Sequence, residues 1–138
     1  MGTSKSYFLL LILLKSEYLP ISDLGVRLKE EKFPEVMVNG NWSPICGHWF
    51  WNNKYGATLF CQMLDPIYTS GIVKKHKEIP LASDGMRIGQ CTSNDNSLLS
   101  CTGGCNDLEL GGQCSNYHHS KCGAGQGATV EIQCLSGM

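Results

Sequence analysis

The stretch NGNWSPICGHWFWNNKYGATLFCQML, residues 39–64, decides the fold of this chain. It opens with Asn39-Gly40, a pair that favours the two-residue turn of a β-hairpin. Residues 35–39 before the turn and residues 42–46 after it therefore predict two antiparallel strands. Pro44 has no backbone N–H to donate, which places the second strand at a sheet edge or a bulge. Residues 26–28 predict a third, earlier strand.

A helix is predicted in the second half of the same stretch. Asn52 or Asn53 can cap its first turn. Apolar residues then recur at helical spacing as far as Leu64. Pro66 ends the helix, because proline disfavours helical backbone in the residue before it.

The rest of the chain gives weaker local signals. Residues 66–89 lack clear periodicity and predict loops with one or two short strands. Residues 102–127 are rich in Gly, Ser, Asn and Cys and cannot bury much apolar area, so they need covalent links to be ordered. The alternation of residues 129–134 predicts a last strand, with Val130 and Ile132 pointing inward.

Length, charge and cysteine content restrict the class of protein. The 138 residues suit one domain, and the formal net charge of -1 gives no strong field for nucleic acid. An even, high number of cysteines in a short chain indicates a disulfide framework in an exported protein. The eight cysteines are Cys46, Cys61, Cys91, Cys101, Cys105, Cys114, Cys122 and Cys134. Their number alone allows about 105 pairings.

Residues 1–24 are predicted to be a signal peptide or an N-terminal apolar segment, followed by one domain over residues 25–138. Lys5 precedes an apolar run at residues 7–14, which is too short to span a bilayer. No small-residue cleavage site follows this run, so a core helix and an uncleaved anchor stay open as alternatives. We expect a protein that is secreted or displayed on the extracellular face of the plasma membrane.

Two segments resemble the scavenger receptor cysteine-rich (SRCR) domain family. The first holds Val38-Asn39-Gly40-Asn41-Trp42, followed by Leu59-Phe60-Cys61-Gln62-Met63-Leu64. The second is the loop from Cys91 to Cys101, with Ser97-Leu98 before its second cysteine. Gly25-Val26-Arg27-Leu28 is similar to the family's usual first strand. The resemblance covers roughly residues 26–134.

The resemblance implies an α+β fold, a small disulfide-rich domain whose curved antiparallel sheet cradles one α-helix. It also implies three disulfide bonds, and a fourth, local bond is the simplest completion. The four expected pairs are Cys46–Cys122, Cys61–Cys134, Cys91–Cys101 and Cys105–Cys114. Its functional implication is a module without catalytic activity or cofactor that binds an extracellular protein, glycan or polyanion.

The charged candidates for ligand binding lie in one short run. Lys74, Lys75 and Lys77 surround His76 and are typical of an anion-binding patch. Arg87 joins this patch if the fold brings it near. A solvated loop with no ligand is the competing interpretation.

Two further candidates lie in the hairpin and just after it. Trp49 and Trp51 alternate with Phe50, so we expect the two tryptophans on one side and Phe50 on the other. Exposed tryptophan favours binding, and a place in the core is the competing interpretation.

Asn41 opens an Asn-Trp-Ser glycosylation signal, and Pro44 directly after it works against modification.

Departures from the family pattern argue against a calcium site. Gly47-His48 stand where the family has two acids, and Arg87-Ile88 stand where it has others. Asp95 and Asp84 are the acids that remain, whereas a hard cation needs several oxygen ligands. We therefore expect no resident metal of this kind.

Enzymatic and zinc-binding alternatives have fewer signals. A small secreted hydrolase or effector would use His48 or the pair His118-His119, but the chain has no G-x-S-x-G or H-E-x-x-H motif. A tetrahedral zinc site would combine the same pair with cysteines, although no C-x2-C spacing is present. Its cysteine ligands would be Cys101, Cys105, Cys114 and Cys122. We expect a binding module and no enzyme.

Overall fold

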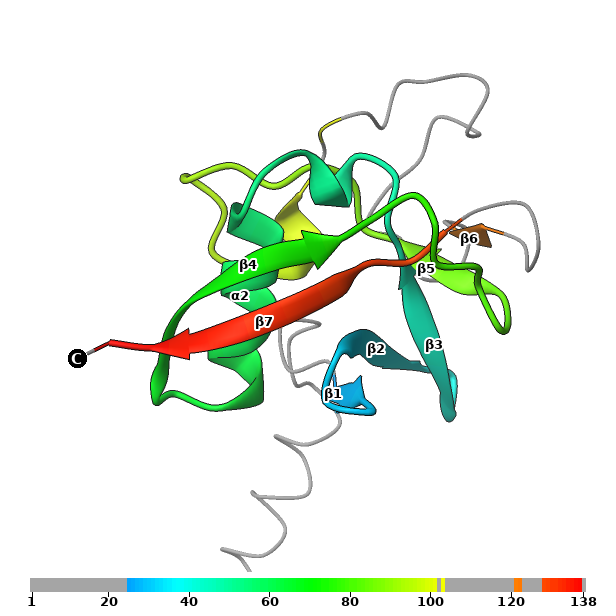
Figure 1. The fold of residues 1–138 in the computed structure, drawn as a ribbon, viewed down its shortest axis with the longest axis horizontal. Coiled ribbons are helices and arrows are strands. Elements are labelled where there is room, and N and C mark those ends of the chain that lie inside the picture. Colours follow the sequence, from blue (N-terminus) through cyan, green and yellow to red (C-terminus); the bar gives the residue numbers. More distant parts are fainter. Residues whose placement is uncertain (1–24, 102, 104–120, 123–127, 138) are drawn as a thin grey trace, which may run out of the picture.

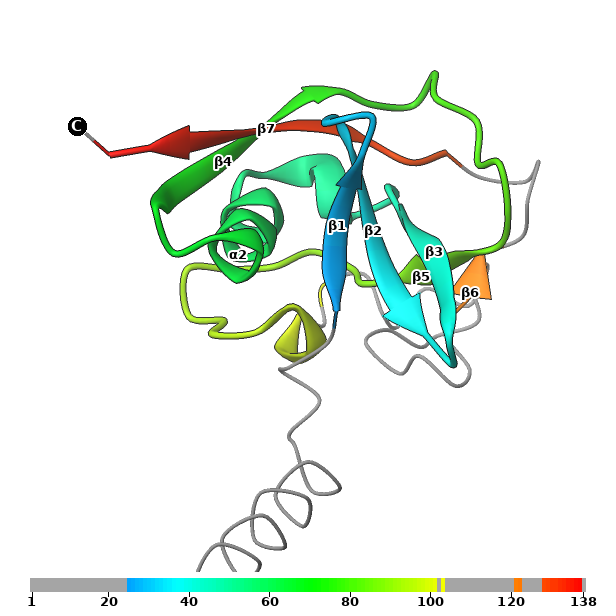
Figure 2. The same ribbon diagram turned by 90° about the horizontal axis from the view of Figure 1, so that it is seen from below.

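The computed structural model describes residues 25–101, 103, 121–122 and 128–137. These residues form two β-sheets, one α-helix and two short 3-10 helices (Figures 1 and 2). In chain order the elements are β1 (Val26–Lys29), β2 (Phe33–Val38), β3 (Asn41–Cys46), η2 (Phe50–Asn52), α2 (Tyr55–Leu64), β4 (Tyr68–Lys75), β5 (Gly85–Arg87), η3 (Leu98–Ser100), β6 (Lys121–Cys122) and β7 (Glu131–Ser136). The α+β class predicted from the sequence is confirmed.

β2 and β3 form the predicted hairpin. Asn39 has φ 50° and Gly40 has φ 83°, so both turn residues adopt the left-handed backbone of a tight hairpin turn. Val38 and Asn41 face each other across it. β1 then pairs with β2 in antiparallel register, which confirms all three strands predicted around this turn.

The larger sheet has the order β1-β2-β3-β5-β6 and is mixed. β3 and β5 run parallel, because the chain passes through α2 and β4 before it returns to form β5. Within β3, only Ile45 and Cys46 pair with β5. Pro44 therefore lies in the half of β3 whose one strand partner among the described residues is β2. The edge position predicted from Pro44 holds for that half, whereas β3 as a whole is an inner strand.

β4 and β7 pair antiparallel in a separate, two-stranded sheet. β7 is the predicted last strand. β4 has eight residues, in a region where the sequence predicts loops and one or two short strands. Its register shifts between Tyr68 and Ser70 and again between Val73 and Lys75. Such bulges interrupt side-chain alternation, which is why the period-two signal of this strand is weak.

The helix α2 packs against β4 and β7, below them in Figure 2. The Thr58 hydroxyl donates to the Gly71 carbonyl (3.3 Å) and accepts from the Gly71 N–H (3.0 Å). Gln62 Nε2 donates to the Thr69 carbonyl (3.3 Å). These helix side chains cover the backbone edge of β4 that faces away from β7. A single antiparallel sheet was expected, but the structure has a mixed five-stranded sheet and a separate β4–β7 pair. The helix packs mainly on the β4–β7 pair.

The N-cap residue of α2 is Lys54, which makes no side-chain capping bond, so neither Asn52 nor Asn53 is the cap itself. Both asparagines nevertheless have specific partners beside it. Asn53 Oδ1 accepts a hydrogen bond from the N–H of Tyr55, the first helical residue (3.0 Å). Asn53 Nδ2 also donates to the Cys91 carbonyl (2.8 Å), and Asn52 Nδ2 donates to Gln90 Oε1 (3.1 Å). The two side chains thus fasten the start of α2 to the loop that begins at Cys91.

Buried apolar side chains from both sheets and the helix form one core. Its largest fully buried members are Val36, Ile45, Phe50, Phe60, Met86, Ile88, Leu98, Val130 and Ile132. Val130 and Ile132 point inward as predicted. Phe50 of η2 and Phe60 of α2 are both fully buried in this core. Their burial holds residues 50–64, which follow the hairpin, against the rest of the domain.

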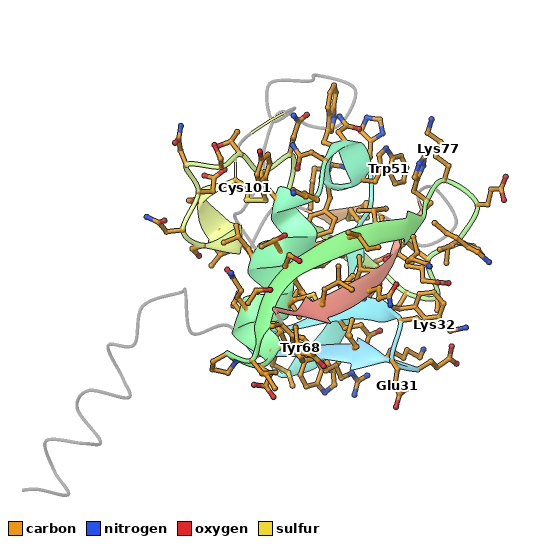
Figure 3. All side chains as sticks on the ribbon, turned by 60° about the vertical axis from the view of Figure 1, so that its left-hand side comes forward. Glu31, Lys32, Trp51, Tyr68, Lys77 and Cys101 are labelled. Carbon is orange, nitrogen blue, oxygen red and sulfur yellow. A yellow bond between two sulfur atoms is a disulfide. The ribbon has the colours of Figure 1, made fainter. Side chains whose placement is uncertain are left out.

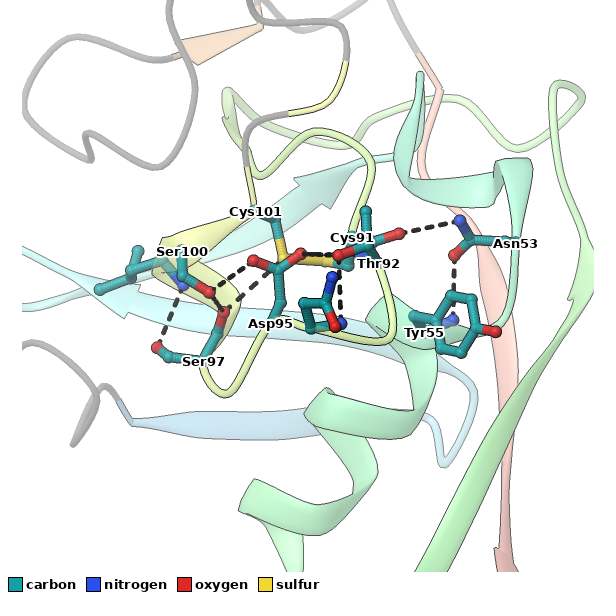
Figure 4. Close-up of a disulfide and its surroundings, with 10 residues drawn as sticks. Asn53, Tyr55, Cys91, Thr92, Asp95, Ser97, Ser100 and Cys101 are labelled. Carbon is teal, nitrogen blue, oxygen red and sulfur yellow. Dashed lines mark hydrogen bonds between the residues drawn. A yellow bond between two sulfur atoms is a disulfide. The ribbon is translucent and has the colours of Figure 1, made fainter.

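Disulfide bonds join elements that lie far apart in the sequence. Cys46–Cys122 links β3 to β6, and Cys61–Cys134 links α2 to β7, across 76 and 73 residues. Cys91–Cys101 closes the short loop shown in Figure 4. These three pairs agree with those implied by the resemblance. The bond expected between Cys105 and Cys114 lies outside the described residues.

Candidate ligand-binding surface

The segment that follows β3 turns sharply to present aromatic side chains. The Gly47 N–H donates to the Ala128 carbonyl (2.7 Å), and Trp49 has left-handed backbone with φ 69°. Phe50 is fully buried, whereas Trp49 and Trp51 are half-buried. The predicted separation of Phe50 from its neighbours is observed, but it arises in the 3-10 helix η2 and not in a strand.

Three of these rings and one distant ring form a cluster. His48 meets Trp49 edge to face with ring centroids 4.9 Å apart, and meets Trp51 in the same way at 5.7 Å. His76, just past the end of β4, lies over Trp51 at 5.4 Å with the ring planes tilted by 32°. Both histidines are exposed. No local signal in the sequence predicted the contact between residues 51 and 76.

Trp51 is held in place from two segments of the chain. A Cβ on Gly47 would overlap the six-membered ring of Trp51, so the backbone of residue 47 lies against the indole. His76 covers the same indole from the end of β4. Trp51 therefore offers little free surface for stacking on a ligand, and its main effect is to fix the position of His76.

The basic run reaches the same corner of the molecule. Lys74 and Lys75 end β4, Lys77 follows His76 with φ 72°, and all four side chains are exposed. Figure 3 labels Lys77 beside Trp51, away from Lys32. We call His48, Lys74, Lys75, His76 and Lys77 the cationic corner. The contact between Trp51 and His76 thus brings the basic run, residues 74–77, next to the aromatic segment, residues 48–51.

Two acidic residues partly offset the positive charge of this corner. Lys75 faces Glu131 across the β4–β7 pair, and opposite charges in such cross-strand positions attract each other. Glu78, also exposed, follows Lys77 in the chain. Of the three lysines in this corner, Lys75 is the one with an acid opposite it in the register of the described strands, whereas Lys74 is the bulged residue and Lys77 lies beyond β4.

Arg87 lies in the other sheet from the lysines of the cationic corner. It is half-buried on β5, opposite Cys46, in the five-stranded sheet. Lys74 and Lys75 instead end β4 of the two-stranded sheet. The extension of the basic patch by Arg87 stays a prediction.

The acids considered for calcium lie in different places. The Asp95 carboxylate accepts hydrogen bonds from the Thr92 N–H (2.7 Å) and hydroxyl (3.2 Å) and from the Ser100 hydroxyl (2.8 Å), as Figure 4 shows. Asp95 thereby organises the loop closed by Cys91–Cys101. Asp84 instead lines a hollow beside the β2–β3 hairpin. Within the described ranges, no group of three or more His, Cys, Asp or Glu side chains is placed to hold a metal ion.

The other functional alternatives rest partly on residues outside the described ranges. His118, His119, Cys105 and Cys114 lie there, and so does the segment 1–24. For His48, the ring partners found among the described residues are indoles, whereas a hydrolase would need an acid and a nucleophile.

No helix in the described part of the chain has the length and apolar character needed to cross a membrane. Comparisons with protein families, with curated proteins and with solved structures each gave no match.

Proposed function

We propose that this chain is an extracellular, disulfide-linked recognition module, similar to an SRCR domain, that binds a polyanionic ligand at the cationic corner. The observation that carries this proposal is the contact of His76 and His48 with the same indole, Trp51, which brings the exposed basic run at residues 74–77 next to the segment that follows β3. The agreement of three disulfide pairs with those implied by the resemblance supports the choice of family.

The charge of the corner contrasts with that of the whole chain. The chain carries a formal net charge of -1, whereas Lys74, Lys75 and Lys77 place three positive charges within four residues. Such a group attracts anions over a distance of about 8 Å at physiological ionic strength. A polyanion with regularly spaced sulfate or carboxylate groups can contact several of these side chains at once.

The structure also explains why the corner keeps a defined shape. The register shift between Val73 and Lys75 leaves Lys74 as an extra residue in β4, and a bulge of this kind re-aims the side chains beside it. The stacking of His76 on Trp51 then fixes the chain just before Lys77. A fixed arrangement of charges loses less conformational freedom on binding than a mobile loop.

Retention on immobilised heparin, a sulfated polyanion, tests the proposal. We expect the variant K74E/K77E to elute at a lower salt concentration than the unchanged protein, because it reverses the two lysines of this corner that have no acid opposite them in the register of the described strands. The matched control is K29E/K32E, which changes the net charge equally at two exposed lysines at the β1–β2 turn.

The retention of the two variants distinguishes binding at the cationic corner from attraction by the net charge of the protein. The control should elute earlier than the unchanged protein by a small margin, and K74E/K77E by a much larger one. Equal losses in both variants would show that only net charge matters and that the cationic corner is not the binding surface.

A further inference from the structure

Asn41 lies at a position suited to covalent modification. It is the first residue of β3, directly after the Asn39-Gly40 turn, and its side chain is exposed. Asn41-Trp42-Ser43 is the one Asn-x-Ser/Thr sequence in the 138 residues. Such a sequence is an acceptor for N-linked glycans in exported proteins when the asparagine lies on the surface.

The strand geometry places the two residues that matter on one face. Successive side chains of a strand point to opposite faces, so Asn41 and Ser43 share a face and Trp42 points to the other. Trp42 is held there by Arg27, whose guanidinium carbon lies 4.4 Å from the centre of the indole. The bulky middle residue is thus turned away from the acceptor amide.

The face shared by Asn41 and Ser43 is open. Both residues line a hollow beside the hairpin, together with Val38, Asp84 and Met86. The exposure of Asn41 means that a bulky group on its amide nitrogen can extend into solvent without displacing the core. A first sugar would lie over this hollow and cover part of its apolar wall.

We propose that Asn41 carries an N-linked glycan, an inference that rests on the export included in the proposed function. The donor would be an oligosaccharide linked to a lipid through pyrophosphate, used by the secretory pathway of the producing cell. The Asn41 amide nitrogen forms a bond to the anomeric carbon, and the bond from that carbon to the pyrophosphate oxygen breaks. The pyrophosphate leaves with the electron pair, and the amide loses one proton.

The glycan would leave the cationic corner free. β3 runs from Asn41 to Cys46 (Figure 1), and at about 3.3 Å per residue this separates Asn41 from Cys46 by roughly 17 Å. His48 of the cationic corner follows Cys46, whereas Asn41 begins the strand, so modification and polyanion binding can be tested separately.

Intact mass measurement tests this inference on the full chain expressed in a eukaryotic secretory cell. We expect secreted protein whose mass includes a glycan, and treatment with an amidase that removes N-glycans should reduce the mass to that of the chain with an aspartate at position 41. N41Q and S43A should lack the glycan. S43T is the matched control and should keep it, because threonine serves equally in the acceptor sequence.

Each outcome decides between the two proposals. Secreted protein without a glycan would overturn the modification and leave the recognition module intact. Protein retained in the cytosol would overturn export and the modification together. Heparin retention of N41Q should equal that of the enzymatically deglycosylated protein, and a large difference would contradict the separation of the two surfaces.

Discussion

Trp51 is the residue on which the cationic corner depends. Its indole contacts the backbone of Gly47 on its own segment and the rings of His48 and His76. Because these contacts come from the segment between β3 and η2 and from the residue that follows β4, one half-buried side chain connects two segments of the proposed binding surface. A residue of this kind positions the groups that meet the ligand and need not touch the ligand itself.

Replacing this indole should weaken binding by loosening the corner. We expect W51A to elute from heparin at lower salt, since His76 loses the ring on which it stacks, and to lose about 2 kcal/mol in the free energy of unfolding, less than a fully buried tryptophan. W51F keeps an aromatic ring and should recover most of the retention. Urea unfolding monitors stability, and retention is compared under conditions where both variants are folded. Unchanged retention of W51A would contradict a positioning role.

At the scale of elements, the contact between α2 and β4 is unusually close. A Cβ on Gly71 would lie 2.6 Å from the Ala57 carbonyl oxygen, so only glycine permits this approach. The approach in turn lets Thr58 reach both backbone groups of Gly71. Thr58 of the helix thus satisfies backbone groups of β4 that a neighbouring strand would otherwise pair with.

The Thr58 hydroxyl should therefore contribute measurably to stability. T58V keeps the shape of the side chain but removes both hydrogen bonds, which leaves the Gly71 N–H and carbonyl without that partner. We expect a loss of about 1–3 kcal/mol in the free energy of unfolding, measured by urea denaturation. T58S retains the hydroxyl and should lose less. Equal stability of T58V and T58S would mean that the hydroxyl contributes nothing.

At the scale of the whole molecule, the two sheets share one core, and each sheet holds one end of a long-range disulfide bond or both. Cys46–Cys122 and Cys61–Cys134 each close a long loop, and Cys91–Cys101 closes a short one. In the chain-entropy account, a bond stabilises the folded state by limiting the unfolded chain, and the effect grows with loop length. The long bonds should therefore matter more to global stability than the short one.

Pairwise removal of the bonds tests this order. With a sequence separation of 76, Cys46–Cys122 should contribute roughly 4–5 kcal/mol, against roughly 3 kcal/mol for Cys91–Cys101 with a separation of 10. We expect C46A/C122A to unfold at a lower urea concentration than C91A/C101A. The opposite order would show that packing around the buried Cys91–Cys101 bond outweighs loop length.

The sequence by itself determined the elements that local chemistry specifies. The Asn39-Gly40 turn, the helical spacing up to Leu64 and the alternation before Cys134 each act within a few residues, and the structure has the hairpin, the helix and the last strand where these signals place them. The cap differs: the N-cap is Lys54, and Asn53 binds the Tyr55 N–H from the position before it. Backbone preferences and side-chain periodicity of this kind do not depend on the rest of the molecule.

Only the tertiary structure decided how distant segments meet. Nothing local specifies that β5 joins β3 in parallel, that Arg87 goes with it, or that β4 with its two register shifts is a strand. The same holds for the contact between Trp51 and His76, which links residues 25 positions apart. These features depend on packing between segments that are remote in sequence, so the proposed binding surface forms only when the chain is folded.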